Sequence, residues 1–380
     1  MEKLKCFCNI SNKPVKKYEG IKKYIATGDV LDNKVVSFLE VDYLTKPSRA
    51  NQEVDIGDVL FAKMIGTEKV LLIDENNVNN IYSTGFFVIK PNTNMIIGKY
   101  LYWLFKSPQF NKAKDKNCKG ATQKALNIDG FEKIEIVKLP SLEEQNKIVN
   151  QLEIIQQVID IRKEQIRQLE DLIKARFVEL FGDVIRNDRG WEQYIFSDIA
   201  TSRLGKMLDA KQQTGQYAYP YLANFNVQWF RFEIDNLNKM DFNEGDRREF
   251  ELRDGDLLVC EGGEIGRCAV WHNEIQPCYF QKALHRVRCN QHIVLPDYMA
   301  WWFKYNCDHK GFAAIEGAKA TIAHLPGAKL KALKVTVPPI ELQNQFVAFL
   351  KQTDKSKFEY ERSLNEIQSL MDSLMQKYFG

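Results

Sequence analysis

The sequence predicts an α+β protein: two globular domains of mixed α/β structure, separated by two long helices that form an antiparallel coiled coil with a pseudo-twofold internal repeat. The first observation is that residues 139–182 recur as residues 337–380, each position matching the one 198 positions later without a gap. The second is the order along the chain, since each copy follows a long stretch of mixed, non-helical sequence. The third is an apolar spacing of three and four residues in both copies, which is typical of a heptad seam.

The repeat divides the chain into four segments. We expect globular domains over residues 1–138 and 184–336, and long helices over residues 139–183 and 337–380. The offset continues weakly into the globular parts, where Trp103, for example, recurs as Trp301. Elsewhere the two globular parts differ almost completely. This pattern suggests one task performed on two different targets.

Composition sets the broad class. A chain of 380 residues with 44% hydrophobic and 12% aromatic residues can bury two substantial cores. It has no apolar run long enough for a signal peptide or a membrane span, so we expect a cytoplasmic protein without membrane contact. The eight cysteines are scattered and form no C-x-x-C pair, which indicates reduced thiols rather than disulfides or a zinc site.

The charge is uneven. The net charge is only +3, but residues 1–140 carry 22 Lys and Arg against 16 Asp and Glu, whereas the helices are slightly acidic. Contact with a polyanion is therefore expected from the globular domains rather than from the helices.

Each long helix begins after a proline followed by acidic residues, Pro140 in the first copy and Pro339 in the second. An amphipathic helix of this length needs a partner for its seam, and the other seam is the expected one, although each helix packing back on its own domain is an alternative. At about 1.5 Å per residue, roughly 38 residues would span about 57 Å. The expected coiled-coil interface is formed by Ile148, Leu152, Ile155, Ile159, Ile166, Leu169, Ile173, Leu180, Phe346, Leu350, Tyr360, Leu364, Ile367, Met371, Leu374 and Tyr378. Apolar residues off the seam are expected to face a second protein: Val149, Val158, Ile161, Leu172 and Phe177.

Three segments of the globular domains suit nucleic-acid contact. Residues 112–127 read as a basic loop rich in amides, in which lysines can neutralise phosphates and Gln or Asn can pair with adenine. Residues 317–324 occupy the matching place before the second helix, and residues 261–267 form a glycine-rich turn ending in an arginine. A further cluster of aromatic and amide residues lies at 217–226. A solvated loop and packed tyrosines are the structural alternatives at these places.

No catalytic motif is evident. The sequence lacks G-x-G-x-x-G, G-x-x-x-x-G-K-[ST], H-E-x-x-H and G-x-S-x-G. Val337-Pro338-Pro339-Ile340 is superficially similar to the Asn/Asp-Pro-Pro-aromatic motif of amino-methyltransferases, but it lacks the Asn or Asp that would hold the target amine. The chain is therefore expected to bind rather than to react.

At the helix entries Pro140-x-x-Glu143-x-Gln145-Asn146 and Pro338-x-x-Glu341-x-Gln343-Asn344, and at the Phe-Gly helix ends, the whole chain resembles the specificity subunits of type I restriction-modification systems. The repeated Gly-Asp turns at Gly57 and Gly255, and the glycines before each helix at Gly120 and Gly317, support the resemblance.

The resemblance implies two target-recognition domains, each reading one half of a bipartite double-stranded DNA site, and a coiled coil that fixes the spacer. It implies docking of two methyltransferase subunits and of restriction (translocase) subunits. The chain itself is expected to bind no cofactor, whereas S-adenosylmethionine, ATP and Mg are expected on the partners.

The residues expected to contact DNA fall into two groups. For the first half-site they are Arg49, Lys63, Lys119, Thr122, Gln123, Lys124 and Asn127. For the second they are Tyr219, Asn224, Arg247, Arg267, Lys319, Thr321 and His324. Two other functions remain open at this point: the recognition subunit of a type IIB-like system, which the neighbouring genes would distinguish, and a coiled-coil assembly scaffold, which sequence-specific DNA retention would exclude.

Overall fold

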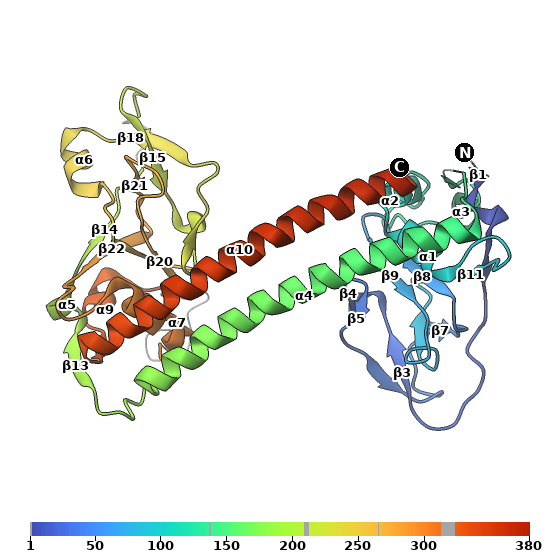
Figure 1. Ribbon diagram of the computed structural model, residues 1–380, viewed down its shortest axis with the longest axis horizontal. Coiled ribbons are helices and arrows are strands. Elements are labelled where there is room, and N and C mark those ends of the chain that lie inside the picture. The colour runs from blue at the N-terminus through green and yellow to red at the C-terminus, as the bar shows by residue number, and fades with distance from the viewer. Residues whose placement is uncertain (1, 137, 209–212, 265, 313–323) are drawn as a thin grey trace. The chain divides into compact units, whose positions relative to one another are not determined.

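The computed structural model describes residues 2–136, 138–208, 213–264, 266–312 and 324–380. It consists of two units, one formed by Met1–Gln165 with Tyr360–Gly380 and the other by Ile166–Glu359. Each unit combines one globular domain with half of each long helix. The four predicted segments are each continuous in sequence. The two units are not: the first unit combines Met1–Gln165 with the C-terminal part of the second long helix (Figure 1).

The first unit contains two four-stranded sheets and two short strand pairs. One sheet is antiparallel, with the order β2 (Cys8–Ser11), β11 (Phe86–Pro91), β8 (Val59–Ala62) and β9 (Val70–Leu72). The other has the order β6 (Leu39–Val41), β3 (Lys22–Ile25), β10 (Ile81–Ser83) and β7 (Ala50–Gln52), with β3 and β10 parallel. The pairs are β1 (Glu2–Lys3) with β12 (Glu135–Ile136), and β4 (Val30–Leu31) with β5 (Lys34–Val35).

Three α-helices complete the described part of this domain: α1 (Gly98–Lys106), α2 (Pro108–Lys116) and α3 (Ile128–Phe131). Helix α1 packs on β8 and β9 through its apolar side. Ser107 ends α1 and caps α2, because its hydroxyl accepts a hydrogen bond from the Phe110 amide at 3.1 Å.

The second unit repeats this topology. Its antiparallel sheet has the order β14 (Ala200–Leu204), β22 (Leu284–Cys289), β19 (Leu257–Cys260) and β20 (Cys268–Val270). Its second sheet has the order β18 (Asn238–Asp241), β15 (Ala218–Leu222) and β21 (Tyr279–Phe280), again with one parallel pair. The strand pairs are β13 (Glu192–Ile195) with β23 (Lys334–Val337), and β16 (Val227–Gln228) with β17 (Arg231–Phe232). Its short helices are α5 (Phe196–Ile199), α6 (Glu244–Phe250), α7 (Pro296–Asp308) and α9 (Gly327–Lys331).

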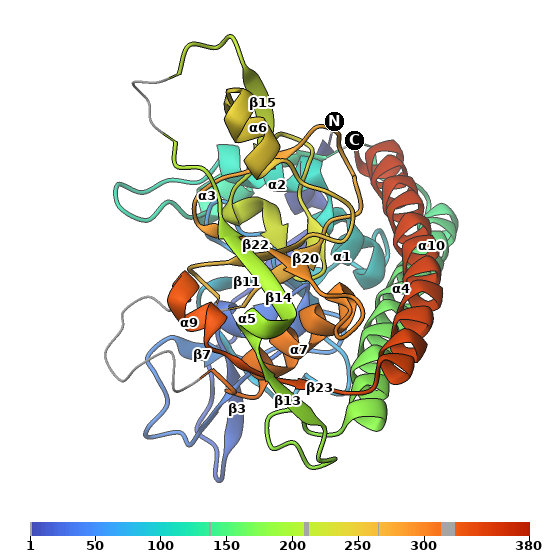
Figure 2. The same cartoon turned by 90° about the vertical axis from the view of Figure 1, so that its left-hand side faces the viewer.

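The two long helices are α4 (Leu142–Phe181) and α10 (Ile340–Phe379), each an unbroken helix of 40 residues. In the first unit Arg162 lies against Tyr360 and Gln151 accepts a hydrogen bond from the Tyr378 hydroxyl at 2.7 Å. In the second unit the Lys357 ammonium meets Glu170 at 2.6 Å and Phe346 lies edge-on to Phe177. In each unit one helix rises in number as the other falls, so the predicted α+β fold with an antiparallel helix pair is confirmed (Figure 1, Figure 2).

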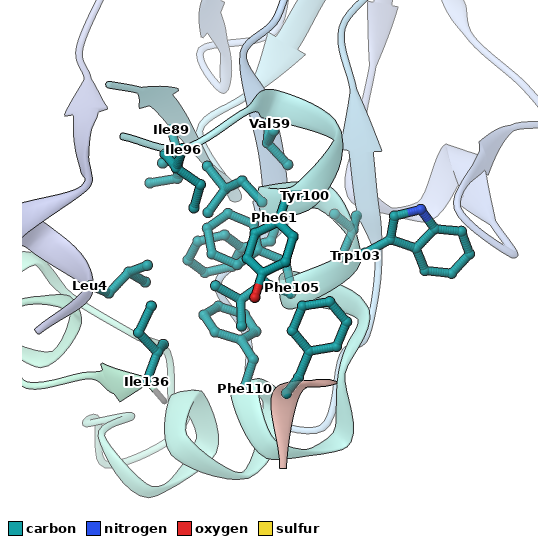
Figure 3. Packing of buried hydrophobic residues seen from close by; sticks show 14 of the residues in the cluster. Leu4, Val59, Phe61, Ile89, Ile96, Tyr100, Trp103, Phe105, Phe110 and Ile136 are labelled. Atoms are coloured by element: carbon teal, nitrogen blue, oxygen red, sulfur yellow. The ribbon is translucent and has the colours of Figure 1, made fainter. Parts of the chain in front are cut away.

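Each helix half enters the core of its own unit. In the first unit Ile148, Leu152 and Phe379 join the core cluster that contains Phe61 and Tyr100. The ring centroids of Phe379 and Tyr100 lie 5.2 Å apart. Figure 3 shows Phe61 and Tyr100 within this cluster. In the second unit, Ile173, Phe177, Phe181, Phe346 and Leu350 join the corresponding cluster. All sixteen residues of the expected interface are buried or partly buried.

Two of the off-seam residues expected to face a second protein are instead internal. Val149 is 2% exposed and Phe177 is 1% exposed, because the ends of α4 pack on a globular domain as well as on α10. Val158 is partly buried, whereas Ile161 and Leu172 are exposed. The ends of α4 therefore bury a wider apolar face than contact with α10 alone would require.

A buried glutamine joins each long helix to its domain. Gln145 is 0% exposed: its Oε1 accepts from the Ile97 amide at 3.0 Å, and its Nε2 donates to the carbonyls of Met95 and Pro140 at 2.8 and 2.9 Å. Gln343, also 0% exposed, makes the same three bonds, to Leu295, Ile293 and Pro338. We call these two residues the glutamine clamps. They give the repeated helix entry a structural role that is identical in both units.

All eight cysteines lie in the described part of the chain and are free thiols. In that same part, every helix is too short or too polar to cross a membrane.

Candidate nucleic-acid interface

The basic segment of the first domain is anchored by a short backbone ladder. The Leu126 amide donates to the Lys63 carbonyl at 2.8 Å, and the Ile65 amide donates to the Lys124 carbonyl at 3.1 Å. Lys119 and Ala125 exchange two backbone hydrogen bonds of 2.9 and 3.0 Å. The ladder holds the turn after β8 beside the base of a tight loop, Lys119–Ala125, which we call the recognition loop.

The recognition loop presents its side chains to solvent. Lys119, Thr122, Gln123 and Lys124 are all exposed. At Gly120 the backbone has a φ of 140°, and an added Cβ would lie 2.3 Å from the Gln123 carbonyl oxygen, so this turn requires glycine. The loop therefore offers two ammonium groups, a hydroxyl and an amide from a fixed base, which suits contact with phosphates and base edges.

The other predicted residues of the first domain differ in availability. Arg49 is exposed, and its carbonyl accepts a hydrogen bond from the Thr84 amide at 2.9 Å. Lys63 is half-buried: its ammonium donates to the Thr84 carbonyl at 2.9 Å, lies 4.3 Å from the centroid of the Phe87 ring, and has a pKa lowered by burial. Thr84 thus links Arg49 to the recognition loop through Lys63, which itself already has structural partners. Asn127 caps α3, since its Oδ1 accepts from the Gly130 amide at 2.8 Å.

The expected basic loop over 112–127 is in part a helix. Lys112, Lys114 and Lys116 belong to α2, and the Lys114 side chain is 1% exposed. Its ammonium donates to the carbonyls of Met64 and Thr67 at 3.1 and 2.5 Å. Lys114 therefore stabilises the turn beside the recognition loop, and the expectation that it belongs to a basic loop is wrong.

The second domain builds the same frame with different side chains. The Leu325 amide donates to the Glu261 carbonyl at 2.7 Å. Gly262 and His324 form an isolated antiparallel β-bridge, as Met64 and Ala125 do in the first domain. His324 is exposed, and its ring Nδ1 lies 4.0 Å from a Glu261 carboxylate oxygen. Lys319 and Thr321 lie outside the described residues.

Two predicted arginines of the second domain are paired with predicted neighbours. Arg267 donates to the carbonyl and the side-chain oxygen of Asn224 at 3.1 and 2.6 Å, while the Asn224 Nδ2 donates to Gly262 at 2.9 Å. Arg247, on α6, donates to the Tyr219 hydroxyl at 3.0 Å and lies over that ring. The structure thus brings Asn224, Arg267 and His324 together around one turn and places Arg247 with Tyr219 in a separate pair.

Sequence reasoning missed the turn beside the recognition loop. Met64 and Ile65 are 40% and 42% exposed there. Lys63 separates Met64 and Ile65 from the buried strand β8, and Gly66 follows them; an apolar pair between a lysine and a glycine was the available signal for a turn. Apolar side chains at this place are suited to the thymine methyl group.

The fold defines a class before any comparison: a duplicated scaffold in which two α+β domains share one frame and carry different surface loops. The sequence of the chain matches the family model of the type I restriction modification DNA specificity domain twice, over residues 2–171 and 188–369. The chain belongs to this family.

Relatives and solved structures agree with the family. The chain is 26% identical over 163 residues to the type I restriction enzyme HindI specificity subunit of Haemophilus influenzae, and 22% identical over 193 residues to the putative type I restriction enzyme MjaX specificity subunit of Methanocaldococcus jannaschii. These matches cover 42% and 50% of this chain, and only 35% and 45% of the relatives' lengths.

The fold is similar to that of the type I restriction-modification S subunit of M. genitalium, with a TM-score of 0.60, 14% identity and coverage of 100% and 95% of the two chains. A chain from a type I R-M system assembly gives a TM-score of 0.57 at 20% identity, covering 94% and 91%. At these identities the likeness concerns the fold.

Proposed function

We propose that this chain is the sequence-specificity subunit of a type I restriction-modification complex, in which each globular domain reads one half of a bipartite DNA site. The observation that carries the proposal is the repeated frame with divergent surfaces. The glutamine clamps and the ladders at Lys63 and Glu261 recur in both domains, whereas the side chains displayed around them differ. One frame with two sets of displayed groups suits two different half-sites.

The recognition loop gives the first test. Replacing Gln123 with Ala removes an exposed amide, so we expect relaxed specificity at one base pair of one half-site, by about 1 to 3 kcal/mol. Replacing Lys119 with Ala removes an exposed ammonium, so we expect binding to weaken on all sequences alike, with a salt slope smaller by about 1. Competition binding of the assembled complex to a library of duplexes, at several salt concentrations, measures both effects.

Lys133→Ala is the matched control, because Lys133 is also an exposed lysine of the first domain but lies beyond α3. It should leave the preferred sequence unchanged. If Gln123→Ala and Lys119→Ala both behave like this control, the recognition loop does not read DNA.

The helix pair is proposed to set the spacer between the half-sites. The test inserts one heptad after Gln165 in α4 and one heptad before Tyr360 in α10. Both insertions lie at the division between the units, so the contacts within each unit are retained. Each helix lengthens by about 10.5 Å, which corresponds to roughly three base pairs, and we expect a spacer wider by that amount with unchanged half-sites. Sequencing of the methylated motif in a strain that carries the insertion measures the spacer. An insertion into α4 alone is the control and should abolish the motif; an unchanged spacer after the double insertion would refute this role.

The helix pair is also proposed to dock two methyltransferase subunits, which would supply S-adenosylmethionine, and to recruit restriction subunits that use ATP and Mg. Leu172 and Leu370 support this proposal, since they occupy equivalent positions of the repeat and both are 50% exposed. Burial explains why Leu152 and Leu350 recur, but it does not explain a repeated leucine on the surface. Ile154 and Ile161, at 61% and 56% exposure, extend the apolar surface of α4.

A further inference from the structure

The turn that follows β8 displays an apolar pair, Met64 and Ile65, beside the recognition loop. The two residues are 40% and 42% exposed. The Ile65 amide donates to the Lys124 carbonyl at 3.1 Å, and Met64 forms an isolated β-bridge with Ala125, so the apolar pair adjoins the base of the loop. A polyanion that is attracted by the exposed lysines of the loop is therefore brought against an apolar surface as well.

Helix α2 holds this turn in one conformation. The Lys114 ammonium donates to the carbonyls of Met64 and Thr67 at 3.1 and 2.5 Å, and the Thr67 hydroxyl donates to the same Met64 carbonyl at 2.5 Å. The adjacent Asp115 carboxylate accepts from the Gly66 amide at 3.1 Å and pairs with Lys114 at 3.1 Å. A lysine that is almost fully buried thus fixes a turn at the surface. Fixing the turn in advance lowers the entropy that is lost on binding, which suits a binding element.

The second domain has the same frame without the apolar pair. In each domain, the amide of the residue before the turn donates to the carbonyl directly before β11 or β22 at 2.9 Å. Gly262 and Gly263 follow in the second domain, 198 positions after Met64 and Ile65. Because glycine has no side chain, a contact made by the apolar pair belongs to the first domain alone and is confined to one half-site.

The chemistry around the apolar pair indicates which part of DNA it contacts. The neighbouring loop displays Lys119 and Lys124, which suit phosphates, and Gln123, which suits the major-groove edge of adenine. The apolar group that DNA presents in the major groove is the methyl group of thymine. Insertion between base pairs from the minor groove requires a side chain that stands clear of the protein, whereas Met64 and Ile65 are each less than half exposed.

We propose that Met64 and Ile65 contact the methyl group of a thymine in the half-site that Gln123 reads, and thereby favour thymine at that position. This inference rests on the proposed function. The thymine lies at or next to the base pair that Gln123 contacts, because Ile65 is hydrogen-bonded to the residue that follows Gln123. The contact is apolar, so it recognises a feature of the base pair that the amide of Gln123 does not.

The first test removes the methyl group from the DNA and leaves the protein unaltered. Each thymine of the methylated motif, on both strands, is replaced singly by deoxyuridine, and the duplexes compete for binding to the assembled complex. Burial of one methyl group corresponds to about a fourfold change in affinity, so we expect a loss of that size at a thymine of the first half-site. The first half-site is the one whose specificity Gln123→Ala relaxes.

The second test assigns this preference to the apolar pair. A double variant with Met64→Ala and Ile65→Ala should bind the thymine and deoxyuridine duplexes alike, whereas Ile65→Val, which keeps an apolar side chain, should retain the preference. Met95→Ala is the matched control, because Met95 is a methionine of the same domain with 41% exposure but lies between β11 and α1. It should retain the full preference for thymine.

Either of two results would overturn the inference: no thymine of the first half-site responds to deoxyuridine, or the double variant keeps the same preference as the unaltered chain. The first result does not depend on the folding of any variant. Loss of a bound methyltransferase subunit from the double variant in native mass spectrometry, with the thymine preference intact, would make the apolar pair a protein contact and overturn it too. If the unaltered complex prefers no DNA sequence, the proposed function itself fails.

Discussion

Replacing Gln145 with Leu should lower the free energy of unfolding of the first unit by about 3 to 5 kcal/mol, because the buried Ile97 amide and the Met95 and Pro140 carbonyls lose their partner. Leucine is similar in size, so the effect isolates the hydrogen bonds from the packing. Gln343→Leu should produce a loss of the same size in the second unit, since its three bonds are equivalent.

Urea denaturation of the full chain, followed by circular dichroism, measures both changes. The neighbouring Asn146→Ala is the control, because Asn146 is exposed and its amide bonds only to the Leu142 carbonyl of its own helix. It should cost less than about 0.5 kcal/mol. A Gln145→Leu variant as stable as this control would mean that the glutamine clamps do not hold the helices to their domains.

Replacing Phe177 with Ala should destabilise the second unit by about 3 to 5 kcal/mol. The ring is 1% exposed and contacts Phe181, Tyr298 and Phe346, so its loss leaves a cavity where α4, α7 and α10 meet. The adjacent Val178→Ala serves as control, because Val178 is 44% exposed and should change stability little.

The same denaturation experiment compares the two variants, with tryptophan fluorescence as a second probe that reports mainly on the second unit, where every tryptophan except Trp103 lies. Trp301 lies 6.2 Å from Phe177 between ring centroids, so it reports on this part of the core. If Phe177→Ala and Val178→Ala are equally stable, α4 does not pack into the second domain as described.

The sequence predicted the frame better than the details within it. A seven-residue apolar repeat is a local property, so the helix pair and its direction followed from the pattern and the duplicated order. The burial of Val149 and Phe177 did not follow, because it depends on domain surfaces that no helical periodicity contains. The wider buried face arises where a helix meets a domain as well as its partner helix.

The candidate site shows the same limit. The recognition loop was predicted from its lysines and amides; these side chains are exposed, and their contact with DNA stays a prediction. Lys114 looked like another lysine of this loop, yet it is buried because its ammonium donates to the carbonyls of Met64 and Thr67, which lie 50 and 47 residues away in sequence. Asn127 likewise serves as a helix cap. Side-chain roles of this kind depend on contacts between segments that are distant in sequence. For the same reason the repeat of Gln145 as Gln343 was visible in the sequence, but the hydrogen bonds that these residues make to their domains were not.

The central claim is that this chain directs methylation to a bipartite DNA site, and long-read sequencing of the methylome with and without its gene tests it most directly. We expect deletion to remove one methylated motif, made of two short half-sites around a fixed gap, and re-expression of the chain to restore it. A methylome that is unchanged by deletion, in a strain whose partner methyltransferase is expressed and active, would contradict the claim.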